Sequence, residues 1–432
     1  MLASKLTRSC IWLSLIAVIC TVPIALAEDW PRWGGSRGDE TWQGPKLPEA
    51  WPAGKLPVAW SRQIGGGYGG VSVAGGRAYV MDRQSEPKEV ERVLCFDAHT
   101  GEPLWSHEYT VAYGKLDYGN GPRSTATVYD GRVYTLGAMG HVLCLNAVDG
   151  KVQWSKDCVA EFIAKIPQWG LAASPVIWKD FVIVHPGSEN GCLMAFDRMT
   201  GKEMWRASSD PAGYATPLII ESPSGPQLIA WTPEHILGAD PRSGKIHWSI
   251  PYEVLYGVSI ATPIYRDNTV FVTGYWAGSK AIRLGKRPED AELVWEENRN
   301  LRGLMAQPLY RDGHVYTIDK DRGLTCFELA TGKKAWDDAH QMTPRGRNPQ
   351  ATLVWLGDGD RAIILNELGD LILARLNARA YHEQSRTNII TRKDNSPIWA
   401  HPAYVGSRVY ARSDSELVCV ELPIQENSKY SE

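Results

Sequence analysis

The sequence lacks most of the patterns that mark a catalytic or metal-binding chain. Its eight cysteines include no neighbouring pair and no Cys-x-x-Cys spacing, which excludes the usual thiol-redox and haem-attachment motifs. It also contains no His-Glu-x-x-His sequence and no Gly-Lys-Ser/Thr phosphate loop. Motifs alone therefore predict no catalytic residue and no metal site.

Neither sign of charge dominates the chain. Lys and Arg total 46 and Asp and Glu total 49, so the formal net charge of the 432 residues is −3. A nucleic-acid-binding domain carries a clear excess of basic residues, usually gathered on one face. The balance of charges excludes that class, and we expect no nucleic-acid partner.

Long apolar runs are missing except at residues 10–27. This run follows the basic residues Lys5 and Arg8 and ends in Ala25-Leu26-Ala27, a small-x-small cleavage pattern. The pattern predicts a signal peptide over residues 1–27, cut after Ala27, and export to the periplasm or beyond the cell. A membrane anchor is the alternative, which Pro23 disfavours. No transmembrane segment is expected in the mature chain.

A hairpin that closes on tryptophan recurs along the chain. "LCFDAHTGEPLW" (94–105), "LCLNAVDGKVQW" (143–154) and "MAFDRMTGKEMW" (194–205) are three of its forms. The closing tryptophans follow one another at intervals of 41 to 51 residues, counted from their positions at Trp60, Trp105, Trp154, Trp205, Trp248, Trp295 and Trp336. A degenerate eighth unit closes on Tyr381. Such a period suits four short strands with their turns, which is one propeller blade.

The rest of each unit supports the same fold. Strands that begin with a small residue and often a proline, such as "AASPVIW" (172–178), precede Asp-Gly turns and β-branched runs. We predict an all-β, eight-bladed propeller of four-stranded antiparallel blades over residues 57–424. The last unit stops at "SELVCVELP" (415–423), so a strand near residues 57–62 is expected to close the ring. The only short helical candidate is residues 160–169.

The remaining segments complete the predicted organisation. Residues 28–56 are rich in Trp, Pro and Gly and read as an extended arm over the propeller, pinned by Trp30, Trp33, Trp42 and Trp51. Residues 425–432 read as a polar tail. The repeat also governs the cysteines, because four of them share one strand position: Cys95, Cys144, Cys326 and Cys419. We predict that they are buried and unpaired.

The hairpin "DaxTGkxxW" resembles the quinoprotein-type, or PQQ-like, propeller repeat. That repeat occurs in pyrroloquinoline-quinone (PQQ)-dependent alcohol dehydrogenases and in the outer-membrane assembly factor BamB. The stretches "DWPRWGGSRGD" (29–39) and "GPRSTATVYDGRVYTLGAMGHVLCL" (121–145) look like a secreted group of planctomycete-type bacteria. The repeat is specific for the fold and says little about activity.

The resemblance implies two functions. In the dehydrogenases, the quinone stacks between a tryptophan and a disulfide of neighbouring cysteines, beside calcium and an aspartate base. This chain is shorter and has no such cysteine pair, and "DKDRG" (319–323) and "GDGD" (357–360) read as turns rather than calcium loops. The first hypothesis is therefore a non-catalytic, BamB-like binding or scaffold module, with no cofactor. The alternative is a PQQ- and calcium-dependent alcohol or sugar oxidoreductase.

The repeat also says where a ligand would bind. The starts of the inner strands converge on one mouth of the central channel. Residues there would stack on or pair with a flat anionic molecule, a glycan or a peptide; they are Arg123, Trp169, Tyr214, Gln307, Arg347, Trp399 and His401. The competing interpretation is that these side chains merely plug the channel. The partner classes we expect are an envelope protein, a peptide or a glycan, bound by a monomer.

Overall fold

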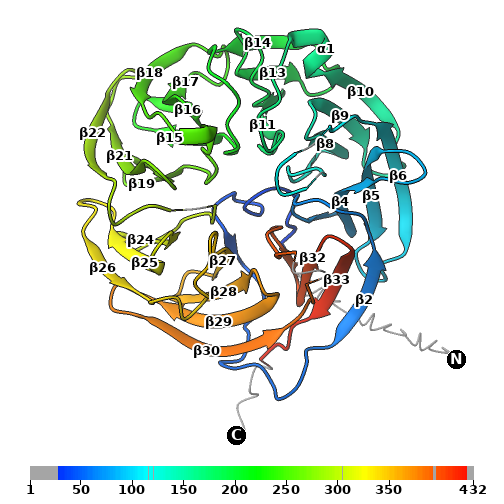
Figure 1. The fold of residues 1–432 in the computed structure, drawn as a ribbon, viewed down its shortest axis with the longest axis vertical. Coiled ribbons are helices and arrows are strands. Elements are labelled where there is room, and N and C mark those ends of the chain that lie inside the picture. Colours follow the sequence, from blue (N-terminus) through cyan, green and yellow to red (C-terminus); the bar gives the residue numbers. More distant parts are fainter. Residues whose placement is uncertain (1–27, 115, 120, 304, 393–395, 426–432) are drawn as a thin grey trace, which may run out of the picture.

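The computed structural model describes residues 28–114, 116–119, 121–303, 305–392 and 396–425. Its strands form eight sheets arranged around a central axis (Figure 1), which confirms the predicted eight-bladed propeller. The predicted signal peptide and all but the first residue of the predicted tail lie outside the described residues. No described helix is long and apolar enough to cross a membrane.

The first four blades follow one another along the chain. Blade 1 consists of β3 (Ser72–Ala74), β4 (Arg77–Gln84), β5 (Val90–Asp97) and β6 (Pro103–Thr110). Blade 2 consists of β7 (Thr127–Tyr129), β8 (Arg132–Leu136), β9 (His141–Asn146) and β10 (Val152–Asp157). Blade 3 consists of β11 (Val176–Trp178), β12 (Phe181–Val184), β13 (Leu193–Asp197) and β14 (Glu203–Ala207). Blade 4 consists of β15 (Leu218–Ser222), β16 (Gly225–Trp231), β17 (His235–Ala239) and β18 (Ile246–Pro251).

The second four blades complete the ring. Blade 5 consists of β19 (Ile264–Arg266), β20 (Thr269–Gly274), β21 (Gly278–Leu284) and β22 (Ala291–Glu297). Blade 6 consists of β23 (Leu309–Arg311), β24 (His314–Asp319), β25 (Gly323–Glu328) and β26 (Lys334–Asp337). Blade 7 consists of β27 (Ala351–Leu356), β28 (Arg361–Asn366), β29 (Asp370–Leu376) and β30 (Tyr381–Asn388). Blade 8 consists of β31 (Ala403–Val405), β32 (Arg408–Arg412), β33 (Glu416–Glu421) and β2 (Val58–Gln63).

The recurring tryptophan joins most blades to the next, whereas Trp248 of blade 4 donates to Gln227 of its own blade. Trp154 of blade 2 donates from Nε1 to the carbonyl oxygen of Arg198 in blade 3, at 3.1 Å. Its ring also lies under Gly201, whose φ is 70° and whose added Cβ would lie 2.7 Å from the indole. Equivalent bonds across blade boundaries are made by Trp60, Trp105, Trp205, Trp295 and Trp336. The Thr-Gly turn and the closing tryptophan are therefore two halves of one contact between blades.

Blade 8 combines the two ends of the propeller sequence. β2 pairs antiparallel with β33, so this sheet takes its outer strand from residues 58–63 and its other three strands from residues 403–421 (Figure 1). The described cysteines are all free and buried: Cys95, Cys144, Cys326 and Cys419 lie on strands, Cys158 begins α1, and Cys192 directly precedes β13.

Helical structure among the described residues is slight. The α-helix α1 (Cys158–Phe162) lies at the start of the predicted helical segment, and the Asp157 side chain caps it by accepting from the amides of Val159 and Ala160. A single 3-10 turn, η1 (Leu255–Gly257), lies between blades 4 and 5.

Candidate functional site at the two ends of the channel

The inner strands share one register, which defines layers of residues along the central channel. Each inner strand ends at a residue that pairs with the second strand just before the hairpin turn. The residue six positions before that one lies where the inner strand begins, and these residues form the mouth layer. With the positions of blades 4 and 7 aligned by sequence, the mouth layer is Tyr68, Arg123, Ala172, Tyr214, Ile260, Met305, Gln350 and Trp399. Three of the predicted site residues, Arg123, Tyr214 and Trp399, belong to it.

Aromatic rings from blades 8, 1 and 2 meet at this mouth. The ring of Trp399 lies 5.7 Å from that of Tyr68 and 5.5 Å from that of Tyr118, centroid to centroid. The Tyr68 hydroxyl donates to the carbonyl oxygen of Tyr118 at 2.6 Å. Asn348 of blade 7 donates to the Tyr118 hydroxyl at 2.9 Å. The sequence analysis did not single out Tyr118, which lies on the long connection between β6 and β7.

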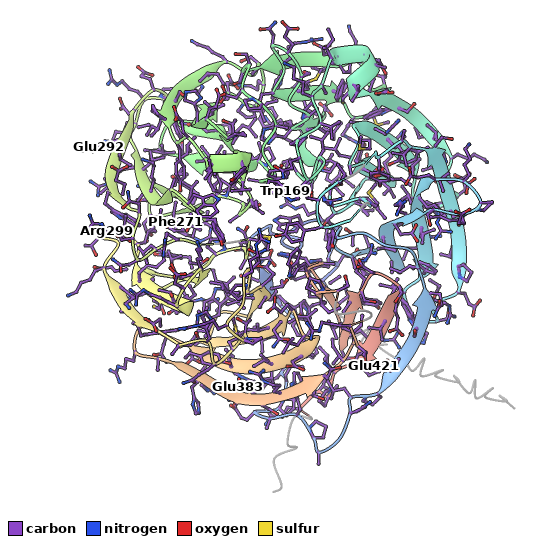
Figure 2. All side chains as sticks on the ribbon, viewed as in Figure 1. Trp169, Phe271, Glu292, Arg299, Glu383 and Glu421 are labelled. Atoms are coloured by element: carbon purple, nitrogen blue, oxygen red, sulfur yellow. The ribbon has the colours of Figure 1, made fainter. Side chains whose placement is uncertain are left out.

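A second aromatic pair stands across the mouth. Trp169 meets Tyr214 edge to face at 5.8 Å, and Figure 2 shows Trp169 beside the central channel. Burial raises the pKa of Tyr214 to about 12, so its phenol stays neutral at physiological pH. The two predicted residues are therefore in contact, with one ring partly exposed and the other buried.

The two predicted arginines have different environments. Arg123 donates to three carbonyl oxygens of its own loop, those of Gly121, Asp117 and Gly119, at 2.6, 3.1 and 2.7 Å. Its guanidinium lies 5.4 Å from the Tyr68 ring centroid, and burial lowers its pKa. Arg347 is exposed and lies three residues upstream of Gln350, which occupies the mouth layer in blade 7. Arg123 thus holds the loop in place, and its guanidinium is already engaged by these carbonyl oxygens.

Two residues further along the inner strands lies a polar ring, to which Gln307 and His401 belong. Its members are Gly70, Thr125, Ser174, Thr216, Thr262, Gln307, Thr352 and His401. In blades 1 to 4, each side-chain hydroxyl accepts from the backbone amide of the preceding blade: Gly70 to Thr125, Thr125 to Ser174 and Ser174 to Thr216, at 3.0, 3.0 and 2.9 Å. These bonds join neighbouring blades around the channel.

The half of the polar ring in blades 5 to 8 is less well satisfied. Gln307 donates to the carbonyl oxygen of Thr262 at 3.1 Å, but its side-chain oxygen and the Thr262 hydroxyl are buried without a hydrogen-bond partner among the described residues. His401 is buried as well, and its Nε2 has no hydrogen-bond partner in the part of the chain that the structure describes. Gln307 and His401 therefore lie inside the channel rather than at its mouth.

The arm of residues 28–56 closes the opposite end of the channel. Trp30 exchanges two backbone hydrogen bonds with Val73 at the end of the blade 1 inner strand, each of 2.8 Å. β1 (Thr41–Trp42) then pairs parallel with β27, which gives blade 7 a fifth strand on its inner side. Figure 1 shows this dark-blue segment at the centre of the ring. The arm thus lies against the inner strands at the channel end.

Side chains of the arm reach the polar ring. The Trp33 ring lies 3.8 Å from the His401 ring, centroid to centroid. Glu40 is 1% exposed, lies 3.4 Å from His401 Nδ1 through Oε1, and neither of its carboxylate oxygens has a hydrogen-bond partner among the described residues. Trp42 is 2% exposed and packs 5.4 Å from the Tyr404 ring. His401 therefore belongs to the floor that the arm builds.

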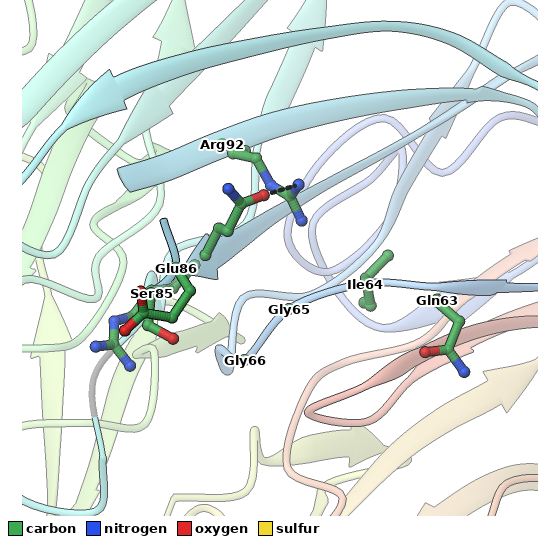
Figure 3. A pocket seen from close by; sticks show the side chains of 9 residues that line it. Gln63, Ile64, Gly65, Gly66, Ser85, Glu86 and Arg92 are labelled. Atoms are coloured by element: carbon green, nitrogen blue, oxygen red, sulfur yellow. Dashed lines mark hydrogen bonds between the residues drawn. The ribbon is translucent and has the colours of Figure 1, made fainter. Parts of the chain in front are cut away.

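Two hollows lie away from the mouth layer. One, of about 450 Å³, is lined by residues that include Gly65, Gly66 and Arg92 (Figure 3). Arg92 is already committed there, since it donates to both oxygens of the buried Asp82 at 2.8 and 2.6 Å. The other, of about 360 Å³, is lined in part by Arg311 and Arg379 at the turns of blades 6 and 7. Neither hollow contains a predicted site residue.

Comparison of the sequence with known proteins identifies its family. A family model, PQQ_2, described as outer membrane protein assembly factor BamB, matches residues 89–285 and 234–430, which together exceed half of the chain. The chain belongs to the PQQ_2 family. This confirms the resemblance inferred from the repeat.

Relatives of this PQQ_2 chain fall into two groups. It is 20% identical over 278 residues to the outer membrane protein assembly factor BamB of Yersinia pestis, covering 61% of this chain and 65% of that protein. It is 29% identical over 219 residues to the dehydrogenase subunit of the alcohol dehydrogenase (quinone) of Komagataeibacter europaeus, covering 46% and 29%. The matches thus span less than two-thirds of these relatives' lengths.

Solved structures show the same fold in both groups. BamB from Moraxella catarrhalis superposes with a TM-score of 0.58 at 16% identity, covering 87% of this chain and all of that one. Quinohemoprotein alcohol dehydrogenase from Comamonas testosteroni superposes with a TM-score of 0.62 at 14% identity, covering 94% and 82%. At these identities the likeness concerns the fold of the PQQ_2 chain, and its function depends on its own mouth and channel.

Proposed function

We propose that this chain is an exported, non-catalytic binding module of the cell envelope, which holds a segment of another envelope protein at the mouth of its channel. The observation that carries the proposal is the exposure of aromatic side chains there. Three of the four exposed aromatic residues among the described positions lie on mouth-face connections: Tyr118, Tyr256 and Trp276, which are 46%, 62% and 43% exposed. Rigid aromatic side chains of this kind are enriched at the centres of protein interfaces.

The closed floor supports the same function. A ligand that entered from the mouth would meet the polar ring, where Trp33 and Glu40 of the arm pack against His401. The mouth is therefore a shallow surface, suited to a loop or an extended peptide rather than to a deeply buried small molecule. Names of the BamB relatives point to envelope assembly, which is consistent with this class of partner.

The residues present do not fit a quinone held as in the dehydrogenases. All six described cysteines are free and buried, so no disulfide lies beside the mouth. The mouth layer contains no carboxylate to hold calcium or act as a base, and Arg123 is occupied by its own loop. The names of the quinone-dependent relatives make the oxidoreductase the alternative to test.

Titration with pyrroloquinoline quinone, with and without calcium, separates the two functions. The purified protein is followed by calorimetry, by quinone absorbance and by dye-linked oxidation of alcohols and sugars. We expect no saturable binding and no oxidation. Micromolar binding that Arg123→Ala or Trp169→Ala abolishes would replace the binding module with the oxidoreductase.

Site-specific photocrosslinking in the envelope tests the binding surface directly. A photoreactive residue at Tyr118 or Tyr256 is expected to give a discrete adduct with an envelope protein. The matched control is Tyr129, which is also 46% exposed but lies at the hairpin turn on the opposite face. Equal adducts at all three positions, or an adduct at Tyr129 alone, would contradict the proposed surface.

A further inference from the structure

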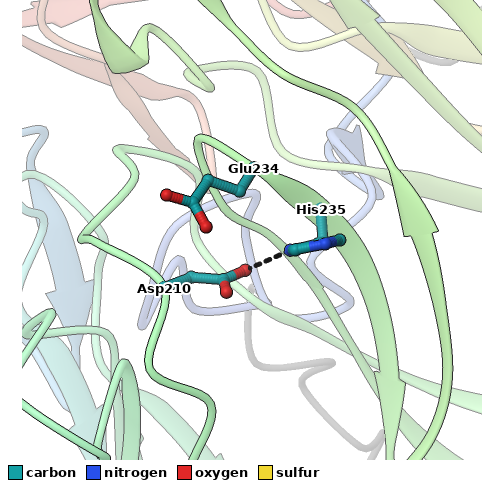
Figure 4. A group of neighbouring side chains, drawn as sticks. All are labelled: Asp210, Glu234 and His235. Atoms are coloured by element: carbon teal, nitrogen blue, oxygen red, sulfur yellow. Dashed lines mark hydrogen bonds and ion pairs between the residues drawn. The ribbon is translucent and has the colours of Figure 1, made fainter.

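A cluster of metal-ligand type lies on the mouth face of blade 4. Asp210 comes from the connection between β14 and β15, Glu234 from the turn between β16 and β17, and His235 from the first position of β17. One ligand atom from each of the three side chains lies within 4.8 Å of the other two. Figure 4 shows the three side chains converging from these segments. Residues 25 positions apart in sequence are thus brought together by the fold.

The spacing suits coordination of one ion. His235 Nδ1 lies 2.9 Å from Asp210 Oδ2. Metal–nitrogen and metal–oxygen bonds of about 2.1 Å would place these two atoms at an angle of about 90° around a shared ion. An ion bound at Nδ1 leaves the ring proton of His235 on Nε2, and the ring is partly exposed to solvent. One imidazole and two carboxylates form a mixed set, which suits first-row transition metals and zinc better than calcium or magnesium.

The electrostatics of the cluster favour a cation. Among the described residues, neither Asp210 nor Glu234 forms an ion pair with a lysine or an arginine; the Asp210–His235 contact is the pair found there. Their negative charge also acts on the interior. The pKa of the Cys192 thiol is raised mainly by burial, and the charges of Asp210 and Glu234 add to that rise. Asp210 is held in place by the Thr232 hydroxyl, which donates to Oδ2 at 2.6 Å. Asp210 is thus held in place, and among the described residues no lysine or arginine neutralises either carboxylate.

We propose that Asp210, Glu234 and His235 bind one divalent ion of the zinc, manganese or cobalt class. Three protein ligands leave at least one coordination position for water. The bound ion would tie the β14–β15 connection to the β16–β17 turn and so fix part of the mouth face. The proposal does not depend on the identity of the mouth's partner. Without an ion, the same residues would form only a hydrogen-bonded turn, Thr232–Asp210–His235.

Metal binding is tested on the tag-free protein, because a histidine tag would itself bind the probe ions. After dialysis against a chelator, Zn²⁺ is titrated by calorimetry and Co²⁺ by its visible absorption. We expect one equivalent of each ion to bind, with a Co²⁺ spectrum of mixed nitrogen and oxygen ligation. Binding only at millimolar ion, or at several equivalents without a defined spectrum, would overturn the proposal.

Variants separate a metal site from a structural turn. Glu234→Gln removes a ligand whose side chain forms no hydrogen bond within the described residues, so folding is expected to remain intact. The affinity should fall at least roughly tenfold, because loss of a supporting residue alone typically costs that much. His235→Gln should abolish the nitrogen-dependent Co²⁺ spectrum. Glu253→Gln, at an exposed glutamate nearby in the sequence, should bind as the wild type does. Unchanged affinity in both Glu234→Gln and His235→Gln would refute the site.

Discussion

The two ends of the central channel are built from similar residues and differ in what those residues contact. At the arm end, Trp30 and Trp42 are 3% and 2% exposed and pack among the inner strands. At the mouth, Tyr118 and Trp276 lie on connections between strands and are 46% and 43% exposed. The same type of side chain therefore serves packing at one end and is available for recognition at the other.

The difference arises from how the backbone is satisfied. The arm has its own hydrogen bonds to the inner strands, including β1 with β27, so its tryptophans are carried into the core. The connections of the mouth bond to themselves and to one another instead: Arg123 donates to its own loop, and Tyr68 and Asn348 form hydrogen bonds with Tyr118. A segment that pairs with a strand becomes part of the fold, whereas one bonded to other connections stays on the surface.

The largest expected effect is the loss of stability from a substitution at the arm end. Trp42→Ala removes a fully buried indole and leaves a cavity against Tyr404 and β27, which should lower the free energy of unfolding by about 3–5 kcal/mol. Trp276→Ala, at an exposed indole of the mouth, should change it by less than about 0.5 kcal/mol. Chemical denaturation of both variants measures the contrast. A similar loss in the two would show that the mouth aromatics are structural.

A second effect concerns pH and the interior beneath the mouth-face loops. Burial lowers the pKa of His185 to about 4 from its ordinary value of 6.5, so the folded protein binds fewer protons there than the unfolded chain. This contribution is present above pH 6.5 and is lost as the pH falls towards 4. The shift corresponds to roughly 3 kcal/mol at most.

Calorimetry at pH 7.5 and 4.5 checks this dependence. His185→Gln should show a smaller drop in melting temperature between the two pH values than the wild type does. His99→Gln, at an exposed histidine of the blade 1 turn, serves as the control and should keep the wild-type difference. An unchanged pH dependence in His185→Gln would mean that other groups govern acid stability.

The smallest effect separates the two halves of the polar ring. Thr125→Val removes the acceptor of the buried Gly70 amide and should cost about 1–3 kcal/mol. Thr262→Val removes a buried hydroxyl for which the described residues offer no hydrogen-bond partner, and it should be close to neutral or slightly stabilising. Parallel denaturation curves of the two variants measure the difference. Equal losses would indicate that water or another group satisfies Thr262.

The repeat made the fold predictable, because each unit carries both halves of a contact. Trp154 and Gly201 are about one period apart, and their spacing alone indicates that neighbouring blades pack through them. The arm was harder to anticipate. Residues 28–56 show no alternation of apolar and polar side chains. β1 forms because Thr41 and Trp42 pair with Trp355 and Leu356 of β27, far along the chain. Local sequence does not contain that information.

The candidate site was predictable only where the inner strands follow the common pattern. A proline marks the register in several blades, so Tyr214 and Trp399 were placed by counting. Blade 7 has a longer hairpin turn and no proline at that position, which hid Gln350. His235 and Asp210 lie far apart in the sequence, so a scan for local motifs sees only a lone histidine.

The pairing of β2 with β33 has a consequence for biosynthesis. The Ser61 hydroxyl donates to the Glu416 carboxylate, 355 positions further along the chain. The outer strand of blade 8 is therefore synthesised early and can pair only after almost the whole chain has been made. Contacts of such long range form late, because much chain entropy must be lost first. During that interval Trp60 and the unpaired edge of β2 are open to chaperones, proteases and other nascent chains. A ring closed in this way makes the newly made protein most vulnerable until its last blade is complete.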